Sequence, residues 1–116
     1  MQLFLFSSEP PSVPQGPINI FKITSESAEI RWNPPENTGG LPLSSYIIEI
    51  REATKSYWRR AATVNATMTS YTITNLNEGT EYIVRVIAKN PEGESLPLTS
   101  DFIAIPKAKC EYLFQL

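Results

Sequence analysis

Hydrophobic and polar residues alternate with a period of two in several short stretches of the chain. Ala28, Ile30 and Trp32 alternate with Glu29 and Arg31, and residues 45–52, 70–74 and 80–90 follow the same rule. Successive side chains of a β-strand point to opposite faces, so each stretch is expected to bury one face. No stretch sustains the period of a helix. The pattern predicts about seven strands, near residues 18–24, 28–33, 45–52, 57–63, 70–74, 80–90 and 98–104.

Turn-forming residues separate these predicted strands. Residues that interrupt a strand lie at positions 33–35 (Asn-Pro-Pro), 38–40 (Thr-Gly-Gly), 75–79 and 90–93 (Asn-Pro-Glu-Gly). Short strands at this spacing, with turns between them, are typical of an antiparallel sandwich. The sequence therefore predicts an all-β fold, a seven-stranded antiparallel β-sandwich.

Three side chains are predicted to have structural roles. Trp32 ends an alternating apolar face just before Pro34, which favours a core anchor over a ligand platform. Leu76 precedes Tyr82 by six residues, with Gly79 between them. This spacing suits a tyrosine corner, in which the Tyr82 hydroxyl bonds back to the backbone across a turn.

Composition narrows the classes of function. The chain has 116 residues, 41% of them hydrophobic and 19% charged, which suits one globular domain. The formal charge of -2 argues against a nucleic-acid binder, and residues 57–60 (Tyr-Trp-Arg-Arg) are interpreted as part of a strand with cross-strand charge pairs. No segment holds the roughly 18 apolar residues that a membrane-spanning helix needs, so no membrane insertion is expected.

Residue types that carry much of enzyme chemistry are missing. The chain has no histidine, which excludes imidazole general-base catalysis, Ser–His pairs and histidine metal ligands. The single Cys110 excludes an intramolecular disulfide and a thiolate metal cage. We therefore expect no catalytic residue, no cofactor and no metal, and a binding or structural module in place of an enzyme.

Several markers in a fixed order resemble a known family. Residues 30–35 read Ile-Arg-Trp-Asn-Pro-Pro, residues 46–49 read Tyr-Ile-Ile-Glu, and Leu76, Tyr82, Asn90, Gly93 and Pro97 follow. This string resembles a fibronectin type III domain over residues 14–106. The resemblance implies an immunoglobulin-like sandwich without a disulfide, with strands A-B-E packed against C-C′-F-G. Residues 1–13 are then expected to be a linker or leader, and residues 107–116 a C-terminal tail or linker.

A finer resemblance is to the modules of the giant muscle proteins titin and twitchin. It rests on residues 14–17 (Pro-Gln-Gly-Pro), the Gly39-Gly40 pair, Trp58 and residues 78–82 (Glu-Gly-Thr-Glu-Tyr). Two positions depart from those modules, because Thr38 stands where they usually carry Asp and Val84 where they often carry Phe.

The finer resemblance implies a structural and protein-interaction module of a multidomain protein. Such a module is a spacer in a tandem repeat of the cytoplasmic sarcomere scaffold. Its expected partners are thick-filament proteins such as myosin and neighbouring immunoglobulin or fibronectin type III domains. The alternative is an extracellular module of a cell-adhesion or signalling receptor.

Strand parity suggests a partner-binding face. If Tyr46, Ile48 and Ile50 face the core, alternate residues of the same strand face solvent, and the family places strands C and F side by side. The outer face would then present Ile47, Glu49, Arg51, Ile83, Arg85 and Ile87. Three exposed isoleucines would form an apolar patch for a protein partner. The alternative is that these isoleucines serve only strand propensity.

Residues 65–67 (Asn-Ala-Thr) have the form of a glycosylation acceptor. Asn65 would be modified if the module is extracellular. The alternative is a chance occurrence in a chain rich in Asn, Ser and Thr.

Overall fold

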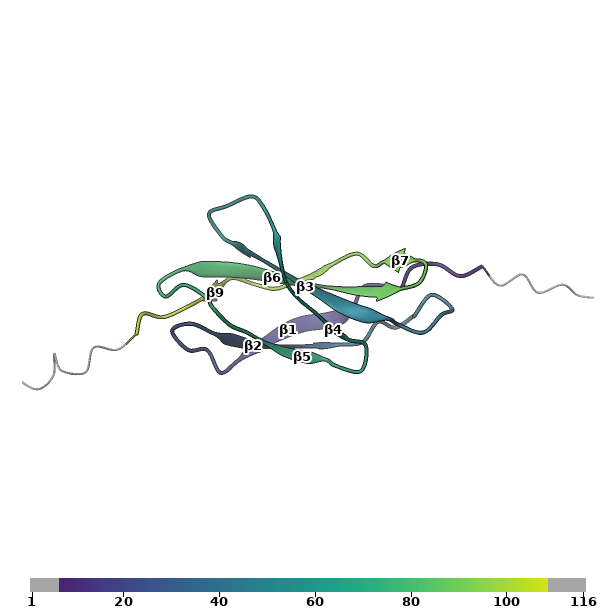
Figure 1. Ribbon diagram of the computed structural model, residues 1–116, viewed down its shortest axis with the longest axis horizontal. Coiled ribbons are helices and arrows are strands. Elements are labelled where there is room, and N and C mark those ends of the chain that lie inside the picture. The colour runs from purple at the N-terminus through teal and green to yellow at the C-terminus, as the bar shows by residue number, and fades with distance from the viewer. Residues whose placement is uncertain (1–6, 109–116) are drawn as a thin grey trace, which may run out of the picture.

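Two antiparallel β-sheets pack face to face in the computed structural model, which describes residues 7–108 (Figure 1). The smaller sheet has the order β1-β2-β5 and comprises β1 (Gln15–Phe21), β2 (Ala28–Asn33) and β5 (Ser70–Ile73). The larger sheet has the order β4-β3-β6-β7, and β8 and β9 also pair with β6. Its strands are β3 (Ser45–Glu52), β4 (Arg59–Asn65), β6 (Glu81–Asn90), β7 (Gly93–Glu94), β8 (Leu98–Thr99) and β9 (Ile103–Ala104).

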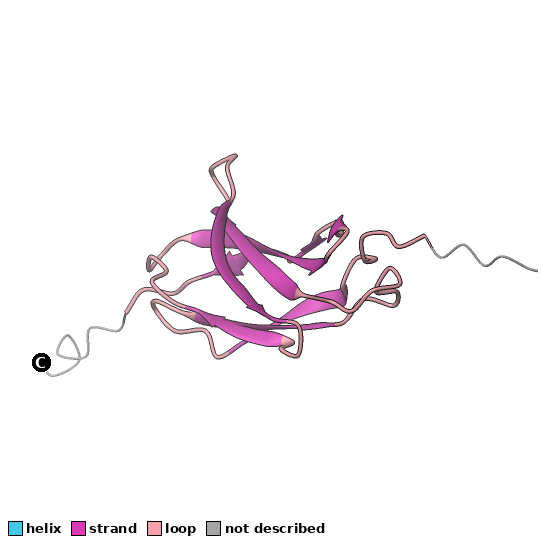
Figure 2. Ribbon diagram, turned by 45° about the vertical axis from the view of Figure 1, so that its right-hand side comes forward, coloured by secondary structure: helices cyan, strands magenta, loops and turns pink. Residues whose placement is uncertain are grey.

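The predicted all-β sandwich is confirmed, with strands A-B-E (β1, β2, β5) against C-C′-F-G. Figure 2 shows only strands and loops in the described part of the chain. None of residues 7–108 lies in a helix long and apolar enough to cross a membrane. Cys110 and the outer parts of the expected leader and tail, residues 1–6 and 109–116, lie outside the described residues.

The seventh predicted strand is divided into the short pieces β7, β8 and β9. The Ser95 hydroxyl accepts the N–H of Ala88 at 2.9 Å, and the Ser100 hydroxyl accepts the N–H of Val84 at 3.0 Å. The six residues 95–100 therefore face the five residues 84–88 of β6, which is the geometry of a bulge. At these two points a serine hydroxyl accepts the N–H group in place of a backbone carbonyl. The hydrogen-bond ladder between the strands is therefore interrupted, but the N–H groups of Val84 and Ala88 keep a partner.

Two of the predicted strands differ in their bounds: β1 spans Gln15–Phe21 where residues 18–24 were predicted, and β4 spans Arg59–Asn65 where residues 57–63 were predicted. β1 ends at Phe21, because Lys22 has a φ of 47° and Thr24 and Ser27 close a turn through an N–H···O bond of 2.9 Å. β4 begins at Arg59, because the chain up to Trp58 belongs to the loop that follows β3. Alternation of side-chain type does not show where the backbone leaves the extended region.

The core lies between the two sheets and is built from the alternate positions of each strand. Tyr46, Ile48 and Ile50 of β3 are each fully buried. Trp32 is 3% exposed, and its ring meets that of Tyr46 edge to face at a centroid distance of 5.3 Å. Burial raises the pKa of the Tyr46 hydroxyl above its ordinary value of 10.0. Trp32 therefore lies where a core anchor must lie.

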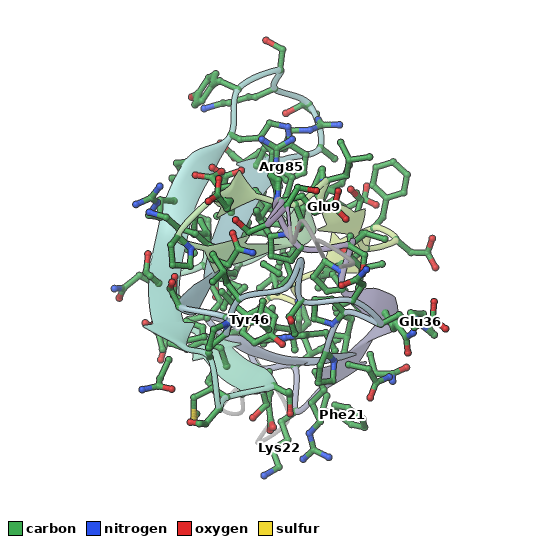
Figure 3. The ribbon with its side chains drawn as sticks, turned by 90° about the vertical axis from the view of Figure 1, so that its right-hand side faces the viewer. Glu9, Phe21, Lys22, Glu36, Tyr46 and Arg85 are labelled. Atoms are coloured by element: carbon green, nitrogen blue, oxygen red, sulfur yellow. The ribbon has the colours of Figure 1, made fainter. Side chains whose placement is uncertain are left out.

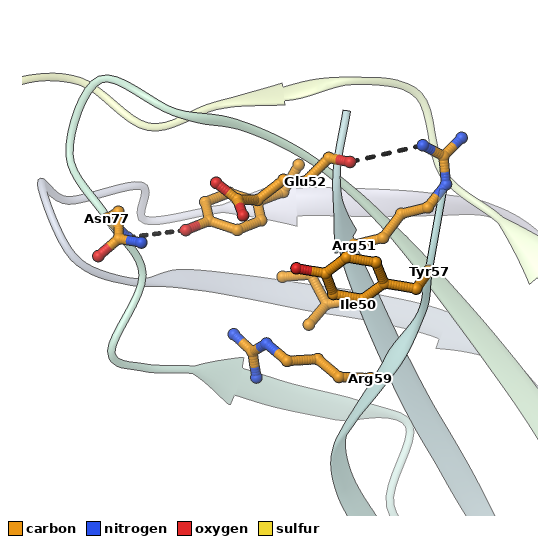
Figure 4. Close-up of a pocket in the computed structure, with 7 residues that line it drawn as sticks. Ile50, Arg51, Glu52, Tyr57, Arg59 and Asn77 are labelled. Carbon is orange, nitrogen blue, oxygen red and sulfur yellow. Dashed lines mark hydrogen bonds between the residues drawn. The ribbon is translucent and has the colours of Figure 1, made fainter. Parts of the chain in front are cut away.

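Tyr82 and Leu76 meet at the turn before β6. Tyr82 is 3% exposed and Leu76 is 5% exposed. The Asn77 N–H donates to the Tyr82 hydroxyl at 2.9 Å, as Figure 4 shows. This bond is the contact that defines a tyrosine corner, and it ties the β5–β6 connection to the larger sheet.

Two tyrosine-to-phenylalanine changes should affect stability differently. Tyr82→Phe removes the acceptor of the Asn77 N–H and should lower the free energy of unfolding by about 0.5–1.5 kcal/mol. The Tyr46 hydroxyl is buried without a hydrogen-bond partner among the described residues, so Tyr46→Phe should leave stability unchanged or raise it. Urea midpoints of the two variants test the assignment, and it would fail if Tyr46→Phe cost more than Tyr82→Phe.

Candidate interaction face

The outer face of β3 and β6 brings together the six predicted partner-binding residues. The register pairs Ile47 with Ile87, Glu49 with Arg85, and Arg51 with Ile83. Strands β3 and β6 are central neighbours in the larger sheet, so these pairs form one continuous strip. We refer to this strip, together with Trp58, as the outer face.

The expectation that the three isoleucines face solvent is wrong. Ile47, Ile83 and Ile87 are 3%, 8% and 6% exposed, although none of them belongs to the core cluster between the sheets. Strand parity assigned their side of the sheet correctly, but it carries no information on what lies above that side. The outer face therefore holds a second buried apolar layer and not an exposed apolar patch.

Trp58 forms a stack with two arginines above this layer. The Arg85 guanidinium lies 4.1 Å from the centroid of the indole ring, and the Arg51 guanidinium lies 5.2 Å from it. Contacts of this kind contribute about 0.5–1 kcal/mol each at exposed sites. Long arginine stems and an aromatic ring cover apolar surface while keeping the charged groups in water. The stack lies next to Ile83, which pairs with Arg51 and lies two residues from Arg85.

Arg51 and Arg85 are each held by a further set of contacts. Arg51 donates from Nη1 to the Lys55 carbonyl at 2.7 Å and, more weakly, to the Ala53 carbonyl. A third, longer bond joins Arg51 to the Glu52 carbonyl (Figure 4), so Arg51 orders the loop after β3. Arg85 Nε donates to Glu49 Oε1 at 2.7 Å. The pair is partly exposed and is worth about 0–1 kcal/mol. Its main effect is to fix the direction of the Arg85 side chain.

Positive charge gathers on the strands that build this face. Strands β3, β4 and β6 together hold five arginines or lysines and three glutamates, a formal charge of +2, whereas the whole chain carries -2. Arg60, which pairs with Glu49 across β3 and β4, and Lys89, which pairs with Ser45, are exposed. These strands are therefore more positive than the chain as a whole, and an acidic surface would complement their charge.

Trp58 belongs to the outer face, although the alternation of side chains along the strands did not predict it. It lies in the loop before β4, which stands out from the sandwich in Figure 2, and its ring reaches the strips of β3 and β6 from there. The sequence did hold a signal, because residues 57–60 place two aromatic residues beside two arginines.

Asn65 lies at the end of β4 and is exposed. Its Oδ1 accepts the backbone N–H of Thr67 at 2.9 Å and the Thr67 hydroxyl at 3.0 Å. The acceptor triplet is thus ordered as a local turn at the surface, where an enzyme can reach it.

The described residues form open hollows but no cluster of metal ligands. Within residues 7–108, no group of three or more acidic or cysteine side chains could hold a metal ion. A hollow of about 110 Å³ lies beside the tyrosine corner, lined by residues that include Ile50, Tyr57 and Tyr82. A larger hollow of about 480 Å³, lined by residues that include Phe21 and Arg31, is wide open to solvent and mostly polar, whereas sites for drug-sized molecules are enclosed and mostly apolar.

Comparisons with known proteins agree with this architecture. The family model described as "Fibronectin type III domain" matches residues 10–101. The chain is 37% identical to Titin of Drosophila melanogaster over 97 residues, 31% to Myosin-binding protein H of Homo sapiens over 96, and 37% to Contactin-1a of Danio rerio over 93. These alignments cover 84%, 79% and 75% of the chain, and 0%, 20% and 9% of the respective relatives.

Solved structures give the same result. Domains A168–A170 from titin superpose with a TM-score of 0.80 at 30% identity, over 86% of this chain and 34% of theirs. The twitchin kinase region from C. elegans superposes with a TM-score of 0.77 at 33% identity, over 84% of this chain and 17% of that one. The predicted resemblance to modules of muscle proteins is confirmed, and the chain spans only a small part of each of these proteins.

Proposed function

Because the chain belongs to the fibronectin type III family, we propose that it is a non-enzymatic spacer and interaction module of a sarcomere scaffold, in the manner of titin and twitchin modules. The observation that carries the proposal is the joint similarity to Titin and to Myosin-binding protein H, at 37% and 31% identity. Residues 14–106 would form the sandwich of the module.

The shape of the module suits a tandem array. The described chain enters the sandwich at one end and leaves it at the opposite end, as the two ends of the coloured ribbon in Figure 1 show. Modules joined in this way extend along a line and do not fold back on one another. Neighbouring immunoglobulin or fibronectin type III domains are the proposed partners at the two ends.

The outer face is the proposed contact with a thick-filament protein such as myosin. Glu49, Arg51 and Arg85 are held in fixed directions there, with Ile47, Ile83 and Ile87 as the buried layer beneath them. Interfaces concentrate their energy in a few aromatic and arginine residues, and the stack of Trp58 with two arginines supplies both types. Because strands β3, β4 and β6 carry an excess of positive charge, we expect the partner to present an acidic surface.

A titration against purified myosin filaments tests this contact. The variant Arg60→Ser with Lys89→Ser removes two exposed cations that flank the outer face, and binding should weaken about tenfold, or 1.4 kcal/mol. The matched control, Lys22→Ser with Lys107→Ser, removes the same charge from exposed positions off the face and should bind as the unmodified chain does. Equal weakening in both variants would mean that net charge alone drives binding, and unchanged binding in both would remove the outer face from the proposal.

The second candidate function is that of an extracellular module of an adhesion or signalling receptor. It is favoured by the exposed, ordered acceptor triplet at Asn65 and by 37% identity to Contactin-1a. A glycan on Asn65 would place the module outside the cytoplasm, and so it separates the two candidates.

A further inference from the structure

Residues 8–12 precede the first strand, and they are bonded to the loop between β2 and β3. The Glu9 N–H donates to the Gly39 carbonyl at 3.0 Å, and the Ser12 N–H donates to the Asn37 carbonyl at 2.9 Å. The Ser12 hydroxyl also accepts the Asn37 N–H at 3.0 Å. We call residues 8–12 the N-terminal strap. Figure 3 looks onto this end of the molecule, with Glu9 labelled.

One buried side chain joins the strap to two loops. Asn90, the last residue of β6, is fully buried. Its Nδ2 donates to the carbonyls of Glu9 and Thr38, each at 2.8 Å, and its Oδ1 accepts the N–H groups of Glu92 at 2.8 Å and Gly93 at 3.2 Å. A side-chain amide has two donors and two acceptor lone pairs, so all four are used. Asn90 therefore links the strap, the β2–β3 loop and the β6–β7 turn.

Gly39 shows how closely the strap lies against the loop. Its φ is +83°, and a Cβ at this position would lie 2.0 Å from the Glu9 carbonyl oxygen and 2.8 Å from Asn90 Nδ2. No side chain fits between the loop and the strap. The neighbouring Gly40 has a φ of +86°, but the nearest atom to a Cβ there is the Ser8 Cα at 3.9 Å.

Contacts at both ends of the strap strengthen this attachment. The Ser8 hydroxyl donates to Glu92 Oε1 at 2.8 Å, and Pro11 is buried. Prolines at positions 10 and 11 further restrict the backbone of the segment. Bonds to two loops and a stiff backbone together leave the segment little freedom.

We propose that the N-terminal strap is a fixed part of the module that sets the direction in which the polypeptide enters the sandwich. Asn90 and Gly39 are the positioning residues for it. In a tandem array the strap would fix the point at which the connection from a preceding module meets the end formed by the β2–β3 loop and the β6–β7 turn, a consequence that rests on the proposed function.

Residual dipolar couplings of the backbone N–H groups test the strap in the unmodified chain. The couplings of Glu9 and Ser12 should fit the alignment tensor defined by the strands of the two sheets, because both N–H groups are bonded to a loop of the sandwich. Couplings near zero at Glu9 and Ser12, with normal values in the strands, would overturn the proposal without bearing on partner binding.

A matched pair of glycine variants then tests the cause. Gly39→Ala and Gly40→Ala carry similar backbone strain, since both glycines have φ near +85°, but only the first displaces the Glu9 carbonyl. Gly39→Ala should bring the residual dipolar coupling of Glu9 close to zero and raise the hydrogen-exchange rate of the Glu9 amide about tenfold or more. Gly40→Ala should leave the coupling and the exchange rate near their original values. Equal effects of the two variants would assign the change to strain in the loop and would contradict the role given to the close approach at Gly39.

Discussion

Replacing Trp32 by alanine is expected to lower the free energy of unfolding by about 3–5 kcal/mol. The ring is 3% exposed and packs edge to face on Tyr46, which is itself fully buried between the two sheets. Removing it deletes a large apolar surface and leaves a cavity that the strands around it cannot fill. Midpoints of urea unfolding for the two proteins measure the loss.

Tyr57 provides the control for this experiment, because it is an aromatic residue that is 61% exposed. Tyr57→Ala should cost under about 1 kcal/mol, as surface changes usually do. A loss of under about 1 kcal/mol for Trp32→Ala as well would mean that Trp32 does not anchor the core.

The double change Ile47→Ser with Ile87→Ser is expected to cost at least about 3 kcal/mol. The two residues pair directly across β3 and β6 and are 3% and 6% exposed. They are buried on the outer side of the larger sheet, so two serines there would lose buried apolar area and bury two hydroxyls. A change at these positions therefore tests stability first, and it is unsuitable as a probe of partner binding alone.

The matched control is Ile47→Val with Ile87→Val, which keeps the branched shape and removes one methyl group from each side chain. This variant should cost roughly 0.5–1.5 kcal/mol per position. If the serine variant unfolds at the same urea concentration as the unmodified chain, the outer face is open to solvent and the second apolar layer does not exist.

Alternation of side-chain type was sufficient to predict most of the sandwich. Residues 28–33, 45–52 and 81–90 are strands within one residue of the predicted bounds, because each has one face in the core. The final strand was harder, since Ser95 and Ser100 replace backbone acceptors and break the ladder while the sequence around them still looks extended. Lys22 likewise ends β1 through a positive φ that its residue type does not signal.

Long-range contacts account for what was missed at the candidate site. The six residues of β3 and β6 were predicted to share a face, and they do, since register follows from the pairing of two neighbouring strands. Trp58 reaches Arg51 and Arg85 on this face from a loop, and no period in the sequence describes such a contact. The strap was equally hidden, because Asn90 and Glu9 are 81 residues apart in the chain and meet only in the fold.

Labelling of striated muscle with an antibody raised against residues 7–108 tests the central claim, that this module belongs to a sarcomere scaffold. We expect regular stripes of label along the thick filaments. In the protein recovered from the tissue, Asn65 should have the mass of an unmodified asparagine. Label confined to cell surfaces, with a glycan on Asn65 that a glycosidase removes, would contradict the claim and assign the module to an adhesion or signalling receptor.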